Sequence, residues 1–130
     1  MSRKAVFHAE TWHLKEPFHI SRGVKTAVDV TVAEISDGAY LGRGESVPYA
    51  HYGESTDSVL EELKAVSSRL EAGCSREELL SIMPAGAARN AIDCALWELE
   101  AKQGGKSVYD IACAKRAERP VTAITIGIGS

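Results

Sequence analysis

Alternating apolar and polar positions predict three β-strands in the first part of the chain. The alternation is loose over residues 4–14, clean over residues 26–35 and short over residues 39–45. In the clean segment, valines at alternate positions share one face, and an aspartate and a threonine lie on the other. The sequence Ser-Asp-Gly at residues 36–38 is typical of a hairpin turn that joins the second strand to the third.

Pro17 predicts the end of the first strand. Proline lacks the amide donor that a strand ladder needs, and it restricts the residue before it. Residues 18–23, which mix apolar and polar side chains, are therefore expected to form a loop. Three antiparallel strands with one polar face need other elements to cover the second face.

A helical spacing of apolar residues in the second half of the chain supplies that cover. The spacing predicts a helix over residues 56–72, which Gly73 ends. Its apolar positions are Val59, Leu60, Leu63, Val66 and Leu70. Ser75 and Glu78 have the spacing of a capping box, which predicts a short second helix that ends before Pro84.

The strongest helical pattern predicts a helix over residues 87–102. Its apolar stripe consists of Ala88, Ala91, Ile92, Ala95, Leu96 and Leu99. The small residues in this stripe would permit close approach to a sheet or to another helix. Cys94 is expected to be buried in the same apolar face, and a further helical turn is predicted at residues 107–112.

Residues 121–128 alternate again and predict a final strand. The three earlier strands are distant in sequence and are already covered by helices, so this strand has no evident partner. We therefore interpret residues 1–118 as one domain and residues 119–130 as the start of a second one. The predicted fold class of the first domain is α+β, a three-stranded antiparallel meander followed by a helical bundle.

Composition and charge exclude several classes of protein. The 130 residues are 45% hydrophobic and 25% charged, which is typical of a soluble globular domain. The net charge of -3 does not provide the basic surface of a nucleic-acid-binding protein. There is no run of about 18 apolar residues that would span a membrane, and no apolar segment of a secretory signal. Three cysteines without a C-x-x-C pair indicate reduced thiols in a cytoplasmic protein.

Residue spacing alone identifies no catalytic set. Gly42 and Gly44 lack the third glycine and the following helix of a dinucleotide site, and they are typical of a bulge or of a close backbone approach. The 4 histidines contain no i, i+4 pair that would hold zinc on a helix, so no metal ligand is assigned. Residues 18–23 and 46–55 form two loops that carry groups able to bind a ligand. These groups are Arg22, Tyr49, His51 and Tyr52.

Residues 88–99, Ala-Arg-Asn-Ala-Ile-Asp-Cys-Ala-Leu-Trp-Glu-Leu, resemble the signature helix of the mandelate racemase/muconate lactonizing branch of the enolase superfamily. Residues 42–49, Gly-Arg-Gly-Glu-Ser-Val-Pro-Tyr, resemble the G-x-G-E-x-x-P segment of that branch. Residues 17–23, 52–55 and 80–91 look like the corresponding segments of dipeptide epimerases, in particular those that act on L-Ala-D/L-Glu.

This resemblance implies an enolase N-terminal-like capping domain over a TIM-like barrel. Residues 119–130 would hold the first barrel strand, and the rest of the barrel is absent from this sequence. Enzymes of the family abstract the α-proton of a carboxylate substrate with barrel lysines, while Mg²⁺ bound by barrel carboxylates stabilises the developing charge. The resemblance therefore assigns no catalytic residue and no metal ligand to this chain, which alone is expected to be inactive. The implied enzyme is a cytoplasmic isomerase of peptidoglycan recycling, with a small dipeptide and the barrel domain as partners, and without nucleic acid or a membrane.

The resemblance also implies roles for individual side chains. Arg22 would meet the side-chain carboxylate of the substrate, and Ile20 and Tyr52 would line the pocket. Thr125, on the first barrel strand, would face the site or fill the barrel interior. Two alternatives remain open, which are the capping domain of another muconate-lactonizing-type enzyme and a non-enzymatic α+β binding module. The dipeptide preference and the formation of a homo-oligomer also remain open.

Overall fold

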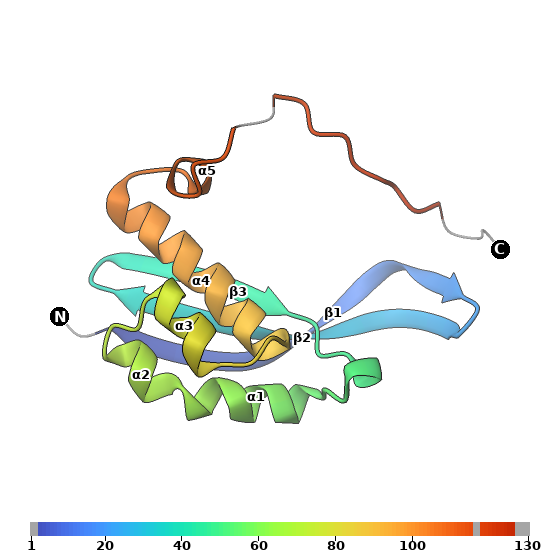
Figure 1. Ribbon diagram of the computed structural model, residues 1–130. Coiled ribbons are helices and arrows are strands. Elements are labelled where there is room, and N and C mark those ends of the chain that lie inside the picture. The colour runs from blue at the N-terminus through green and yellow to red at the C-terminus, as the bar shows by residue number, and fades with distance from the viewer. Residues whose placement is uncertain (1–2, 116–117, 127–130) are drawn as a thin grey trace.

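The first part of the chain forms a three-stranded antiparallel sheet (Figure 1). The computed structural model describes residues 3–115 and 118–126. The strands are β1 (Lys4–Ile20), β2 (Gly23–Asp37) and β3 (Tyr40–Ser46), in the spatial order β1-β2-β3. The predicted meander is confirmed, because consecutive strands pair as two successive hairpins.

The helices follow in the second half of the described chain. They are the 3₁₀ helix η1 (Ala50–Tyr52), α1 (Thr56–Ala65), α2 (Ser67–Glu71), α3 (Arg76–Ile82), α4 (Ala87–Gly104) and α5 (Val108–Ile111). The predicted capping box is confirmed, since the Ser75 side chain accepts from the Glu78 amide and the Glu78 carboxylate accepts from the Ser75 amide. The helix predicted over residues 56–72 is instead two helices, which are separated at Val66 with φ of -101° and ψ of 2°.

The hydrophobic core lies between the sheet and the helices. Its buried residues include Ala33, Ile35, Val59, Leu63, Leu70, Leu79, Ala88, Ala91, Ile92, Ala95, Leu96 and Leu99. The predicted stripe of α4 is therefore confirmed. Cys94 is exposed, contrary to expectation, because its position on α4 lies beside the stripe rather than within it.

Helix α4 packs closely on β3 at two glycines. A methyl group at Gly42 would overlap the carbonyl oxygen of Ala95, and one at Gly44 would overlap the carbonyl oxygen of Ala91. The prediction that these glycines permit a close backbone approach is thus confirmed.

The expectation of one polar sheet face is wrong. Ala33 and Ile35 of β2 face the helical core, so Val30 and Val32 point to the opposite side, yet these two valines are only 1% and 0% exposed. These two valines are shielded by charged and aromatic side chains of the neighbouring strands, which hydrogen-bond to one another. Glu10 accepts from the Trp12 indole at 2.8 Å and from the Arg43 guanidinium at 2.6 Å. Because β2 is the central strand, side chains from both of its neighbours can shield its valines.

Three polar side chains of α4 bond to the outward-facing backbone of β3. Lys102 Nζ donates to the Leu41 carbonyl at 2.6 Å, the Arg43 amide donates to Glu98 Oε2 at 2.6 Å, and Asn90 Nδ2 donates to the Glu45 carbonyl at 3.3 Å. One edge of the sheet is therefore covered by the same helix that packs on its face.

The first hairpin extends beyond the helices, as Figure 1 shows. Strand β1 does not end before Pro17, and residues 18–23 are not a loop, because pairing resumes from Phe18 to Ile20. Between the pairs His13–Ala27 and Phe18–Lys25, β1 contributes residues 14–17 and β2 contributes Thr26 alone. Pro17 is tolerated since it lies in this bulge, where no ladder donor is required. All residues from 11 to 26 are exposed.

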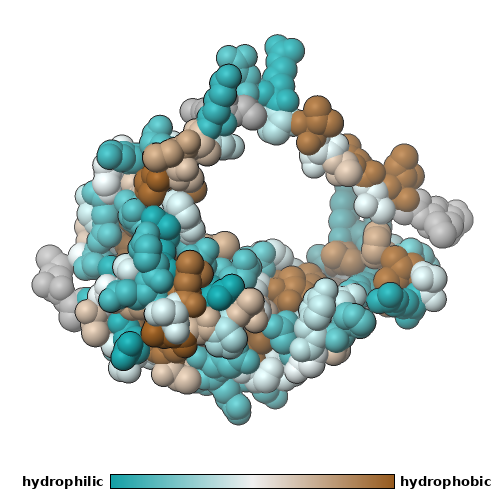
Figure 2. Space-filling view, in the orientation of Figure 1, coloured by the Kyte–Doolittle hydropathy of each residue, from teal (hydrophilic) through white to brown (hydrophobic). Residues whose placement is uncertain are grey.

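The predicted final strand is absent from residues 121–126, and residues 127 and 128 lie outside the described part of the chain. A strand needs a neighbour for its amides and carbonyls, and the three-stranded sheet does not adjoin this segment. Val121, Ile124 and Ile126 are 99%, 85% and 91% exposed. Figure 2 shows such apolar side chains along the C-terminal segment and the projecting hairpin.

Candidate functional site

The tip of the first hairpin carries two of the predicted binding residues. Ile20 is the last residue of β1, and Arg22 occupies the turn to β2, directly before Gly23 with φ of +134°. Within the described residues, the Arg22 guanidinium makes no hydrogen bond or ion pair. The N–H donors of this guanidinium are therefore available to a ligand.

The second predicted loop folds around η1 and presents three rings. The Tyr52 amide donates to the Tyr49 carbonyl at 2.9 Å, and Gly53 ends the turn in the left-handed conformation with φ of +74°. The rings of Tyr49, His51 and Tyr52 contact one another, with centroids separated by 5.2 to 6.4 Å. Tyr52 is 77% exposed and lines an open groove of about 480 Å³ beside the start of α4.

Glu54 fixes this second loop to the helical core. One carboxylate oxygen accepts from the Tyr49 amide at 3.2 Å, and the other accepts from the Ala87 amide at the start of α4 at 2.8 Å. Gly86, the N-cap of α4, has no side chain, and a methyl group there would lie 3.1 Å from Glu54 Oε1. Sequence analysis did not single out Glu54. The available signal was the glycine at the N-cap of α4, which has no side chain to cap the first amides of the helix.

A lysine connects the hairpin to the second loop. Lys25 Nζ lies 5.5 Å from the centroid of the Tyr49 ring, within the range of a cation–π interaction. Sequence analysis did not single out Lys25. No hydrogen bond, ion pair or ring contact joins Arg22 to Tyr52 within the described residues. Thr125 is exposed, in a described segment without helix or strand.

The described residues do not form a metal site. In the ranges 3–115 and 118–126, no group of three or more histidines, cysteines, aspartates and glutamates is placed to hold a metal ion. The carboxylate of Glu10 accepts from Trp12, His8 and Arg43. These partners, first the Trp12 indole and then the His8 ring, lower the pKa of Glu10. Its oxygens are thus engaged within the sheet rather than offered to a ligand.

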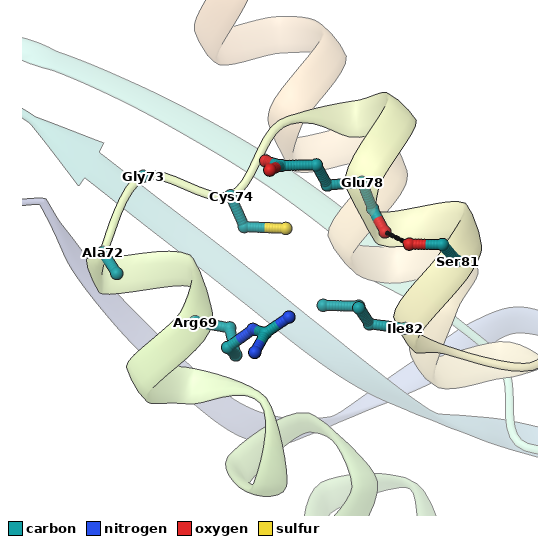
Figure 3. A pocket seen from close by; sticks show the side chains of 7 residues that line it. All are labelled: Arg69, Ala72, Gly73, Cys74, Glu78, Ser81 and Ile82. Atoms are coloured by element: carbon teal, nitrogen blue, oxygen red, sulfur yellow. Dashed lines mark hydrogen bonds between the residues drawn. The ribbon is translucent and has the colours of Figure 1, made fainter.

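A pocket of about 320 Å³ between α2 and α3 lies at the opposite end of the molecule from the hairpin tip (Figures 1 and 3). Figure 3 shows the Cys74 thiol and the Arg69 guanidinium pointing into it. Burial, followed by the charge of Glu78, raises the pKa of the Cys74 thiol. Because the thiolate is the nucleophilic form of cysteine, this shift makes Cys74 less reactive than an unperturbed cysteine.

No helix within the described residues is both long enough and apolar enough to cross a membrane. The sheet with helices on one face, and the exposed hairpin tip and loop at one end, define an α+β domain. The chain belongs to the family "Mandelate racemase / muconate lactonizing enzyme, N-terminal domain", which matches residues 2–112.

Relatives of known structure or activity share this fold. The chain is 45% identical over 121 residues to L-Ala-D/L-Glu epimerase of Escherichia coli K12, covering 93% of this chain and 38% of the relative. It is also similar to an enolase family member from Agrobacterium tumefaciens that is homologous to dipeptide epimerases and whose structure contains sodium and L-Ala-L-Glu. The two chains are 43% identical with a TM-score of 0.91, and the match covers 98% of this chain and 39% of the relative. A dipeptide epimerase from Cytophaga hutchinsonii, complexed with Mg and D-Ala-L-Val, is 26% identical with a TM-score of 0.80, covering 99% and 38%. The chain therefore spans about two fifths of the length of these relatives.

Proposed function

We propose that this chain is the capping domain of a two-domain dipeptide epimerase that acts on L-Ala-D/L-Glu. The observation that carries the proposal is the match over 98% of the chain, at a TM-score of 0.91, to a relative that contains L-Ala-L-Glu. The 45% identity to an L-Ala-D/L-Glu epimerase supports the same substrate class. Residues 1–118 form the cap in this proposal, and residues 119–130 lead into a barrel.

The chemical step of the proposed enzyme is inversion at the α-carbon of a dipeptide residue. We assign proton transfer to lysines of the barrel, and we assign Mg²⁺, which would stabilise negative charge next to that carbon, to barrel carboxylates. The Mg in the Cytophaga relative supports a magnesium ion in the whole enzyme. The free thiols in this chain suit a reducing compartment, in keeping with a cytoplasmic enzyme that recycles cell-wall peptides.

This chain contributes selection of the substrate and exclusion of water. Arg22 presents a planar, permanently charged donor group, which suits the side-chain carboxylate of a glutamyl residue. Ile20 and Tyr52 provide apolar surface on the hairpin and on the second loop, at 39% and 77% exposure. Their burial against a bound dipeptide would remove water from around the charged pair and strengthen it. Thr125 is assigned to the barrel side of the same site.

Replacing Arg22 tests the proposed selectivity. In the two-domain enzyme, Arg22→Ala should lower kcat/KM for L-Ala-L-Glu by about 10- to 100-fold, because a hydrogen-bonded charged partner is lost. The kcat/KM for a dipeptide with a neutral second residue should change by less than about 3-fold. Lys15→Ala, on the same hairpin, is the matched control for loss of a positive charge. Equal losses on both substrates would remove the role assigned to Arg22.

A further inference from the structure

The tip of the first hairpin is only weakly connected to the rest of the molecule. The bulge at residues 14–17 interrupts the pairing of β1 with β2, so the tip at residues 18–25 lies beyond a break in the ladder. All of these tip residues are exposed. An element with few buried contacts and an interrupted ladder opens at low free-energy cost. A contact that crosses the bulge therefore has a large influence on the position of the tip.

Lys25 makes such a contact. It pairs with Phe18, so it is the first paired residue of β2 on the tip side of the bulge. Its Nζ lies 5.5 Å from the Tyr49 ring centroid. Among hydrogen bonds, ion pairs and ring contacts of the described residues, this is the one that joins a tip side chain to the body of the domain.

The partner of Lys25 is itself held firmly. The Tyr49 amide donates to Glu54, and Glu54 also accepts from the Ala87 amide at the start of α4. Helix α4 is the longest helix and packs on the sheet at Gly42 and Gly44. A continuous chain of contacts therefore connects α4 to the hairpin tip through Glu54, Tyr49 and Lys25.

We propose that the contact between Lys25 and Tyr49 is a clasp that sets the position of the hairpin tip, and with it the position of Arg22, over the second loop. The existence of the clasp is inferred from the contact geometry alone. Its effect on catalysis rests on the proposed function. Lys25 and Tyr49 are positioning residues, because they act through Arg22 rather than on the substrate. Without the clasp, the tip occupies the substrate-binding arrangement for a smaller fraction of the time, and the apparent affinity falls by that fraction.

The clasp is tested first by hydrogen exchange of the tip amides, which requires no substrate. In the two-domain protein, Lys25→Met and Tyr49→Leu should each raise the exchange rates of residues 18–26 by about 2- to 5-fold, the range of an exposed cation–π interaction. Lys25→Arg and Tyr49→Phe keep a cation and a ring, so both should retain the wild-type rates. Lys15→Met changes the same charge on the same hairpin away from Tyr49 and should also leave the rates unchanged.

A double variant then separates the clasp from two independent effects. If the two side chains act together, combining Lys25→Met with Tyr49→Leu should give no further increase in exchange over either change alone. Additive increases, or exchange rates that remain at the wild-type value in both single variants, would overturn the proposal. Lys25 is on the surface, so its variants are expected to fold.

Kinetics provide the functional readout. Lys25→Met should raise KM for L-Ala-L-Glu by about 2- to 5-fold with less than a 2-fold change in kcat, and Lys25→Arg should restore the wild-type KM. An unchanged KM would overturn the positioning role. If the wild-type protein epimerises no dipeptide, the proposed function fails, while the exchange experiment still decides whether the clasp exists.

Discussion

At the scale of single residues, two glycines determine how near α4 lies to the sheet. Methyl groups at Gly42 and Gly44 would overlap carbonyl oxygens of α4, and at Gly44 a methyl would also lie 2.8 Å from the Ala95 amide nitrogen. These contacts are to helix backbone, which cannot rotate aside as a long side chain can. The sequence motif that contains both glycines is therefore explained by packing.

Gly44→Ala should lower the free energy of unfolding by about 2 to 3 kcal/mol, since overpacking against a backbone forces the helix outward. Urea denaturation followed by circular dichroism measures the change in the midpoint. Gly104→Ala is the matched control, because a methyl group there meets nothing within 4 Å in the last turn of α4. That variant should be unchanged or more stable by about 0.5 to 1 kcal/mol. A Gly44→Ala protein as stable as the wild type would show that α4 is less closely packed than described.

At the scale of elements, α4 covers both a face and an edge of the sheet. Burial acts to raise the pKa of the Glu98 carboxyl, but the Arg43 amide and the Lys102 ammonium outweigh burial and lower that pKa. The carboxylate thus stabilises the folded state above the pKa of about 4.3 that glutamate has in an unfolded chain. This contribution is lost as the pH falls through the lower pKa of the folded state.

Glu98→Gln should therefore lower the free energy of unfolding by about 1 kcal/mol at pH 7, after allowance for solvent screening of this partly exposed group. The difference from wild type should shrink as the pH is lowered below about 4.3. Thermal unfolding across a pH series measures both effects. Glu62→Gln, on the exposed side of α1, should change the stability by less than about 0.5 kcal/mol at pH 7. A stability difference between Glu98→Gln and wild type that is constant down to pH 2 would contradict the assignment.

Periodicity predicted most elements, and its failures have physical causes. The meander, the capped α3 and the apolar stripe of α4 follow from local signals. Alternation in β2 identified two faces, but it could not show which one the helices cover. The face with Asp29 and Thr31 also carries Ala33 and Ile35 of the core, and the shield over Val30 and Val32 comes from other strands. The extension of β1 past Pro17 depends on a bulge, which a rule about single residues does not anticipate.

The candidate site residues remain predictions, and their arrangement was not foreseen. Arg22 and Tyr52 were singled out because they lie in segments rich in ligand-binding groups, and the family resemblance then assigned their roles. Lys25 was missed since its contact with Tyr49 joins residues that are separated by most of β2 and the whole of β3. Glu54 was recognised only as part of a loop, because its two backbone partners come from different elements.

At the scale of the whole molecule, the described residues 118–126 expose an apolar segment. Val121, Ile124 and Ile126 are each more than four-fifths exposed. In the proposed enzyme this segment enters a barrel and is buried there. A chain without the barrel presents it to solvent, where it favours association with other copies.

The isolated chain should therefore self-associate in sedimentation velocity experiments at micromolar concentration. Replacing Ile124 and Ile126 together with aspartate should shift the distribution toward the monomer by removing apolar area. The pair Thr122→Asp and Thr125→Asp adds the same charge to the same segment and should have a smaller effect. A wild-type chain that is monomeric at all concentrations would contradict the prediction.

The exposure of the hairpin from residue 11 to residue 26 has a consequence for how such proteins diverge. Substitutions on a surface away from the core change the stability by less than about 0.5 kcal/mol. New side chains at the tip can therefore be sampled by natural variation with little effect on folding. In the proposed enzyme, preference for acidic, basic or apolar dipeptides can therefore change through this one hairpin while the buried framework stays the same.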